Sequence, residues 1–138
     1  MEITVNYLAV LVGAVVAMAI GALWYSPKIF GNMWIRESGL SPEALAANKA
    51  KGMGKAYTLS FIFTLLSVYV LAHFVALLSV TSLAGVVELV FWIWLGFSLP
   101  VFVGAALWEG RSVKYIAVNA LQQLIALGAA GKILILFQ

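Results

Sequence analysis

The sequence contains no cysteine and very few charged residues. The lack of cysteine among its 138 residues excludes disulfide bonds, thiolate metal sites and redox mechanisms built on paired cysteines. Charged residues make up only 9% of the chain, whereas a soluble domain has about 25%. With so few charges the chain cannot form a water-solvated surface, so its solvent must be lipid.

The residues needed for catalysis are also scarce. The chain has one histidine, no aspartate and no pair of carboxylates close in sequence. It has no glycine-rich phosphate loop and no cluster with metal-ligand spacing. We therefore expect no catalytic residues, no metal, no cofactor and no enzymatic activity. The formal net charge of +3 is explained more directly by basic residues retained on the cytoplasmic side than by a nucleic-acid partner.

Apolar residues dominate what is present. They make up 64% of the sequence, and the mean hydropathy is +1.09. A run of this kind that exceeds 20 residues crosses a hydrocarbon core of about 30 Å as a helix. The first run begins with Glu2 and carries no lysine or arginine, which favours a retained helix over a cleaved signal peptide. The sequence predicts an all-α polytopic membrane protein, a single domain over 1–138 with four spans at about 3–25, 56–79, 84–108 and 113–137.

The basic residues predict the orientation in the membrane. Seven of the eight lie in the first and third loops: Lys28, Arg36, Lys49, Lys51, Lys55, Arg111 and Lys114. By the positive-inside rule these loops face the cytoplasm. We therefore expect a multi-pass protein of the cell membrane with both termini outside and a helical cytoplasmic loop at 26–55.

The end of the first span carries an aromatic motif. Trp24 and Tyr25 have rings suited to the headgroup layer, and Ser26 and Pro27 are typical of the N-cap and first position of a new helix. Ser41-Pro42-Glu43 predicts the start of a second short helix in the same loop.

A similar ending closes the third span, where Ala105-Ala-Leu-Trp108 repeats the pattern of Gly21-Ala-Leu-Trp24. Glu109 and Arg111 follow in a tight turn, where we expect a salt bridge that locks the turns. Pro100 predicts a kink near Gly96 because proline removes a helical hydrogen bond.

Small residues predict close packing of the first span. Gly13, Ala17 and Gly21 are four residues apart and share one helix face, which lets another helix approach closely. We expect this seam to contact a helix of the bundle or of a partner subunit.

Polar residues within the spans form two candidate groups. His73 and Glu88 could meet near the outer face as a proton or ion path, or each could extend separately to water. Asn119, Gln122 and Gln123 form the second group, and unpaired amides are costly in hydrocarbon. We expect these amides to face inward, as glue between helices or as the lining of a polar path.

The sequence resembles a known family. The matching features are Asn6-Tyr7, the stretch Gly21-Ala-Leu-Trp-Tyr-Ser-Pro-Lys-Ile-Phe-Gly31 followed by Trp34, and the turn Trp108-Glu-Gly-Arg-Ser. Together they resemble the domain of unknown function 1761 family, whose members are small four-helix integral membrane proteins. The resemblance implies the fold class, and it implies no activity and no site residues.

The function classes that remain are those of a membrane protein. The first is a small oligomeric transporter or channel that uses the polar residues as a path. The alternative is a non-catalytic structural or regulatory membrane subunit, and a membrane enzyme comes third. The expected partners are the lipid bilayer and either further copies of the chain or another membrane protein.

Overall fold

The computed structural model describes residues 2–138, and this part of the chain forms helices and turns without strands. Four helical stretches are long and apolar enough to cross a membrane: α1 (Tyr7–Trp24), α4 (Gly54–Leu77), the continuous stretch Leu83–Glu109 and α7 (Val113–Leu136). Two short helices, α2 (Gly31–Glu37) and α3 (Pro42–Ala50), lie between α1 and α4. The predicted all-α membrane fold with a helical first loop is confirmed.

Side-chain caps fix where three of the long stretches begin. Asn6, Ser82 and Ser112 each accept a hydrogen bond from a backbone N–H three residues later, at 3.0–3.1 Å. Such a cap satisfies one of the free donors of the first helical turn. The third stretch ends at Gly110, whose φ of 69° belongs to the left-handed region that favours glycine.

The third stretch is interrupted by a π-helix. It consists of α5 (Leu83–Ile93), η1 (Trp94–Ser98) and α6 (Leu99–Glu109). Pro100 has no N–H to donate to the carbonyl of Gly96, and one residue earlier the N–H of Leu99 bonds to the oxygen of Trp94 instead. The disturbance expected near Gly96 therefore takes the form of a wider helical turn.

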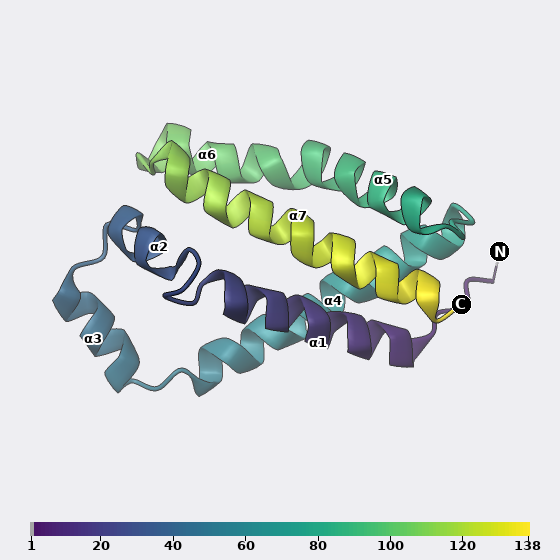
Figure 1. Ribbon diagram of the computed structural model, residues 1–138, viewed down its shortest axis with the longest axis horizontal. Helices are drawn as coiled ribbons and strands as arrows, with labels where there is room; N and C mark the ends of the chain where they lie inside the picture. Colours follow the sequence, from purple (N-terminus) through teal and green to yellow (C-terminus); the bar gives the residue numbers. More distant parts are fainter. Residues whose placement is uncertain (1) are drawn as a thin grey trace.

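α7 lies at the centre of the helix arrangement (Figure 1). It packs against α1 on one side and against α5 and α6 on the other, while α4 crosses α1. α4 and α5 are neighbours in the sequence, but α4 packs mainly on α1 and α5 mainly on α7. Both termini lie at one end of the bundle, which we call the terminal end, and α2 and α3 lie at the other, the loop end.

The tightest packing lies in the terminal half of the bundle. A Cβ added at Gly13 would lie 3.1 Å from Cγ1 of Val68 and 3.5 Å from Cβ of Ala130, so α1, α4 and α7 meet there. Ala17 is buried further along the same face of α1. The surrounding core is entirely apolar: Ala9, Val10, Ala14, Val68, Leu71, Ala72, Val75, Val86, Val90, Ala130 and Leu134.

The first loop does not begin as predicted. No helix starts at Ser26 and Pro27, because the hydroxyl of Ser26 donates back to the carbonyl of Leu23 at 2.7 Å instead of capping forward. The chain turns here, and the N–H of Gly31 bonds to the carbonyl of Ser26 at 2.9 Å before α2 begins. The second prediction for this loop is confirmed, since Ser41 caps α3 through the N–H of Ala44 at 3.1 Å.

Candidate functional site

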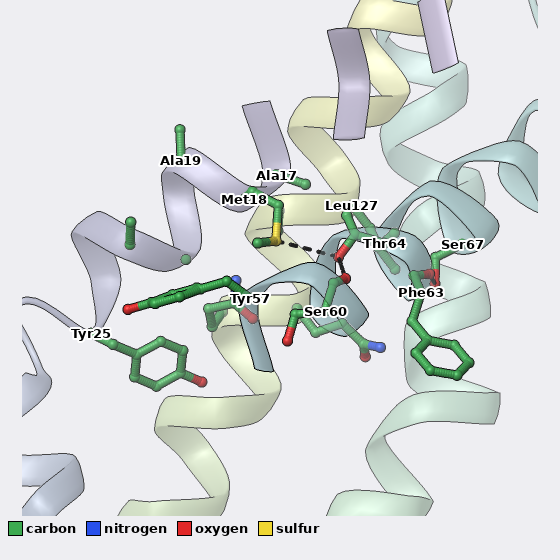
Figure 2. Close-up of a pocket in the computed structure, with 15 residues that line it drawn as sticks. Ala17, Met18, Ala19, Tyr25, Tyr57, Ser60, Phe63, Thr64, Ser67 and Leu127 are labelled. Carbon is green, nitrogen blue, oxygen red and sulfur yellow. Dashed lines mark hydrogen bonds between the residues drawn. The ribbon is translucent and has the colours of Figure 1, made fainter. Parts of the chain in front are cut away.

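A cleft lined by apolar residues and several polar side chains lies between α1, α4 and α7 toward the loop end, and we call it the loop-side cleft (Figure 2). Its volume is about 760 Å³. The cleft begins where the tight packing around Gly13 ends. Its lining residues nearest to that packing are Ala17 on α1 and Ser67 on α4. The lining consists of Ala17, Met18, Ala19, Gly21, Ala22, Tyr25, Tyr57, Ser60, Phe63, Thr64, Ser67, Gln122, Gln123, Ala126 and Leu127.

The α4 wall carries a stripe of hydroxyl groups. Tyr57, Ser60, Thr64 and Ser67 follow one another at intervals of three and four residues, so they share one face of the helix. The hydroxyl of Thr64 donates to the carbonyl of Ser60 at 2.7 Å, and that of Ser67 donates to the carbonyl of Phe63 at 3.0 Å. These bonds to the preceding turn use the hydroxyl protons and leave the oxygen lone pairs free.

The α7 wall carries amides. Gln122 and Gln123 are half-buried and both line the loop-side cleft. The Oε1 atom of Gln123 is buried and has no hydrogen-bond partner. Asn119 lies one turn away and is held by Tyr25, whose hydroxyl donates to its Oδ1 at 2.7 Å. The structure thus directs the three amides of α7 toward protein or the cleft.

The α1 wall combines Met18 and Tyr25 with several small residues. Ala17, Gly21 and Ala22 fill little space, so the cleft stays open between the two polar walls. A Cβ added at Gly21 would lie 3.3 Å from Nε2 of Gln122, which is the far end of a flexible side chain. The predicted seam therefore has two parts: Gly13 lies in a tight helix crossing, and Gly21 faces the cleft.

The aromatic motif at the end of α1 points into the bundle. The indole Nε1 of Trp24 donates to the carbonyl of Val118 at 3.0 Å, and Tyr25 bonds to Asn119 as described. We expect both rings at the level of the headgroup layer, and within the protein their polar groups hold α1 to α7. Trp108, at the similar end of α6, is 88% exposed, so the two endings are alike in sequence and different in role.

His73 and Glu88 are not brought together. The Nδ1 atom of His73 lies 3.0 Å from the carbonyl oxygen of Tyr69, and the imidazole ring packs edge-on against the Tyr69 ring at 4.5 Å. Glu88 is exposed on α5 and borders an open hollow that it shares with Lys132 of α7. Their helices pack against different neighbours, which explains the separation.

The expected salt bridge in the third loop is also missing from the described residues. Arg111 instead donates through Nη1 to the backbone carbonyl of Ser38, and its guanidinium lies 5.2 Å from the centre of the Tyr115 ring. Glu109 is exposed. Arg111 therefore fastens the end of α2 to the start of α7.

A smaller hollow lies at the opposite end of the same three helices. Its volume is about 210 Å³, and its innermost residues include Ala9 on α1 and Ala72 on α4. We call it the terminal-side hollow. Between it and the loop-side cleft lies the tight crossing of Gly13, Val68 and Ala130, which we call the plug.

Sequence reasoning missed the α4 wall of the cleft. The signal was present, because serine, threonine and tyrosine recur at helical spacing in residues 57–67. In membrane helices the hydroxyl groups of serine and threonine often bond only to carbonyls of their own helix. The spacing alone therefore did not distinguish the wall of a cleft from hydroxyl groups with no role beyond such bonds.

The fold and the cleft define a class: a polytopic helical membrane protein with a partly polar cleft between three of its spans. Comparison of the sequence with known families places the chain more narrowly. Residues 8–135 match the family described as "Protein of unknown function (DUF1761)", and the chain belongs to it. No curated protein matches the chain. No solved structure matches it either.

Proposed function

We propose that the protein is a non-enzymatic membrane transporter for a small solute, and that α1, α4 and α7 form the path. The observation that carries this proposal is the pair of hollows at opposite ends of one three-helix interface. A carrier that opens alternately to the two sides needs one solute site and a barrier that can shift from one side of it to the other. The plug supplies such a barrier.

The closed segment between the loop-side cleft and the terminal-side hollow is short. From Ala17 to Ala9 the rise along α1 is about 12 Å, and from Ser67 to Ala72 the rise along α4 is about 8 Å. α4 contacts the bundle mainly through α1, so we propose that α4 moves away from α7 at the crossing, which separates Val68 from Ala130, and tilts about its contact with Gly13. Such a tilt would close the loop-side cleft and widen the terminal-side hollow.

The proposal includes an orientation. The seven basic residues of the first and third loops belong to the loop end, while Lys132 is the single basic residue near the terminal end. By the positive-inside rule the loop-side cleft opens to the cytoplasm, and both termini lie outside the cell membrane.

The second candidate is a non-catalytic subunit of a membrane complex. It is favoured by α4, whose first turns, Gly54–Ser60, are exposed on every side. In this case a helix of a second copy or of another membrane protein would fill the loop-side cleft and cover this part of α4. Small residues on α1 suit close approach of such a helix.

Flux measurements separate the two candidates. The purified protein is reconstituted in liposomes, and the entry of a panel of small solutes is followed by light scattering. Ala22→Trp would fill the cleft from an exposed position, and we expect it to reduce flux at least tenfold. Val15→Trp is the matched control, since Val15 is also exposed on α1 but does not line the cleft.

Two results would reject the transporter. One is flux no faster than in protein-free liposomes for every solute, and the other is equal flux through wild type and Ala22→Trp. The subunit candidate is tested in the cysteine-free background with Ser60→Cys labelled by a photoreactive maleimide, which on illumination in native membranes should crosslink to a neighbouring chain. Absence of any crosslinked species would reject the filled cleft.

A further inference from the structure

We propose that the solute is uncharged and rich in N–H or O–H donors, as small polyols and small amides are. This inference rests on the proposed function, because it concerns what the loop-side cleft accepts. It follows from how the polar groups of the cleft already use their protons, and from the absence of charge in its lining.

Three hydroxyl groups of the cleft can only accept further hydrogen bonds, because their protons are already bonded. The hydroxyl protons of Thr64 and Ser67 are bonded to carbonyls of their own helix, and that of Tyr25 is bonded to Asn119. Each of these oxygens keeps lone pairs for a further partner. A ligand that donates hydrogen bonds complements these oxygens, and the Ser60 hydroxyl and the side-chain N–H groups of Gln122 and Gln123 remain as donors for the ligand's own oxygens.

Gln123 adds an acceptor that has no other partner. Its Oε1 atom is buried in the wall of the cleft without a hydrogen bond. A buried polar atom without a partner is rare in folded proteins and calls for a bound group or water. A rotation of the Gln123 side chain would present Oε1 to the cleft, where an N–H or O–H of the solute would satisfy it, and this would make Gln123 a specificity-determining residue.

The cleft gives no compensation for charge. No aspartate, glutamate, lysine, arginine or histidine lines it. An ion that leaves water here finds no counter-charge, and the few polar groups of the cleft do not form a ring of ligands that could replace its hydration shell. Cations are disfavoured further by the basic residues at the loop end, of which Lys55 lies two positions before Tyr57 of the lining. Anions would meet the acceptor oxygens directly.

The apolar residues of the lining favour a solute that also has a compact carbon skeleton. Met18, Phe63 and Leu127 lie among the polar groups of the cleft, as Figure 2 shows. A polyol or an amide presents both surfaces, since its donors alternate with CH groups. Ligand sites commonly combine a mostly apolar lining with a few placed polar groups.

The first arm of the test is a solute panel. Wild-type protein in liposomes is given erythritol and malonamide, which are neutral donors, and tetramethylammonium and glycine betaine, which carry charge and no donor. We expect erythritol or malonamide to enter at least ten times faster than in protein-free liposomes, and the charged solutes to show no acceleration. Equal acceleration of the charged solutes would leave transport intact and overturn the solute class.

The second arm tests Gln123 and includes a readout independent of transport. Gln123→Leu should lower the flux of the neutral donors at least tenfold, while Asn48→Leu, which removes an exposed amide of α3 outside the cleft, should leave it within twofold of the wild type. In detergent, 100 mM erythritol or malonamide should raise the Tm of the wild type but not of Gln123→Leu.

The two failures are distinguishable. No flux for any solute, together with the expected Tm shifts, would reject transport and retain a binding site for neutral donors. Flux of neutral donors that is equal in wild type and Gln123→Leu would retain transport and reject the role of Gln123. Melting of both variants in ligand-free buffer shows whether each is folded. If Gln123→Leu is not folded, Gln123→Asn replaces it, with a shorter acceptor and the same expected loss.

Discussion

The hydroxyl of Tyr25 donates a 2.7 Å hydrogen bond to Oδ1 of Asn119, and this bond joins the end of α1 to α7 at the mouth of the loop-side cleft. The Tyr25 ring also packs edge-on against Trp34 of α2 at 6.1 Å, and Trp34 stacks on Tyr115 of α7 at 6.2 Å. The guanidinium of Arg111 lies over the Tyr115 ring, 5.2 Å from the ring centre. The loop helix α2 is therefore connected to the cleft through a continuous row of aromatic contacts.

Removing the Tyr25 hydroxyl should weaken this junction. Tyr25→Phe leaves Oδ1 of Asn119 without its donor in a half-buried position, and the expected cost is about 1 kcal/mol of unfolding free energy. The measurement is a lower Tm in detergent. Tyr57→Phe is the control, because Tyr57 is exposed and its hydroxyl makes no hydrogen bond with the described residues. Equal Tm values for the two variants would contradict the assignment.

Arg111 should stabilise the attachment of the first loop to α7. Arg111→Gln removes the donor to the Ser38 carbonyl and the cation over Tyr115, interactions that contribute about 1 kcal/mol each at partly exposed sites. We expect faster trypsin cleavage after Lys49 and Lys51 while the spans stay protected. Lys114→Gln also removes one positive charge, from an exposed position, and should cleave at the wild-type rate. Equal cleavage of all three proteins would reject the fastening role.

Hydropathy and capping residues were sufficient to predict the membrane class. Long apolar runs have few alternatives to a helix in lipid, because every backbone group must be satisfied within the segment. Ser41 was also predicted as a cap, since it precedes proline and glutamate at the expected positions. These features depend only on neighbours in sequence.

Features that depend on a neighbouring helix were not predictable in detail. Ser26 has the same local signal as Ser41, but its hydroxyl bonds backward because the following turn is closed by Gly31. The indole of Trp24 donates to the carbonyl of Val118, a partner on α7 that the residues around Trp24 in the sequence do not indicate. The separation of His73 from Glu88 likewise follows from which helices α4 and α5 pack on, which sequence order does not specify.

Gly31 should be intolerant of any side chain. A Cβ there would overlap the carbonyl oxygen of Tyr25 and lie 2.8 Å from that of Ser26, and backbone atoms cannot move aside as side chains can. Gly31→Ala should therefore destabilise the protein by about 1–3 kcal/mol. Gly54→Ala is the control, since a Cβ at Gly54 meets nothing within 4 Å. The measurement is the Tm of each variant in detergent. An unchanged Tm for Gly31→Ala would show that the backbone of Tyr25 and Ser26 does not approach Gly31 as closely as described.

Cysteine labelling should establish the orientation. The natural chain has no cysteine, so single variants give an unambiguous signal. With the loop end in the cytoplasm, Ser41→Cys should react with an impermeant maleimide only after the cells are permeabilised. Thr81→Cys, exposed in the turn at the terminal end, should react in intact cells. The opposite pattern would invert the orientation and place the loop-side cleft outside.

Gly13 and Gly21 should respond differently to the same substitution, although they belong to one small-residue seam. At Gly13 a new side chain would meet Val68 and Ala130 in the plug, at 3.1 and 3.5 Å from its first atom, and both neighbours are fully buried. At Gly21 it would meet only the mobile end of Gln122 and then extend into the cleft. Gly13→Leu should therefore cost about 1–3 kcal/mol through overpacking, and Gly21→Leu less than about 1 kcal/mol. Tm values in detergent measure the order, with Gly104→Leu as a control because a Cβ at Gly104 meets nothing within 4 Å. A larger loss for Gly21→Leu would mean that the tight crossing, and with it the plug, lies at the loop end.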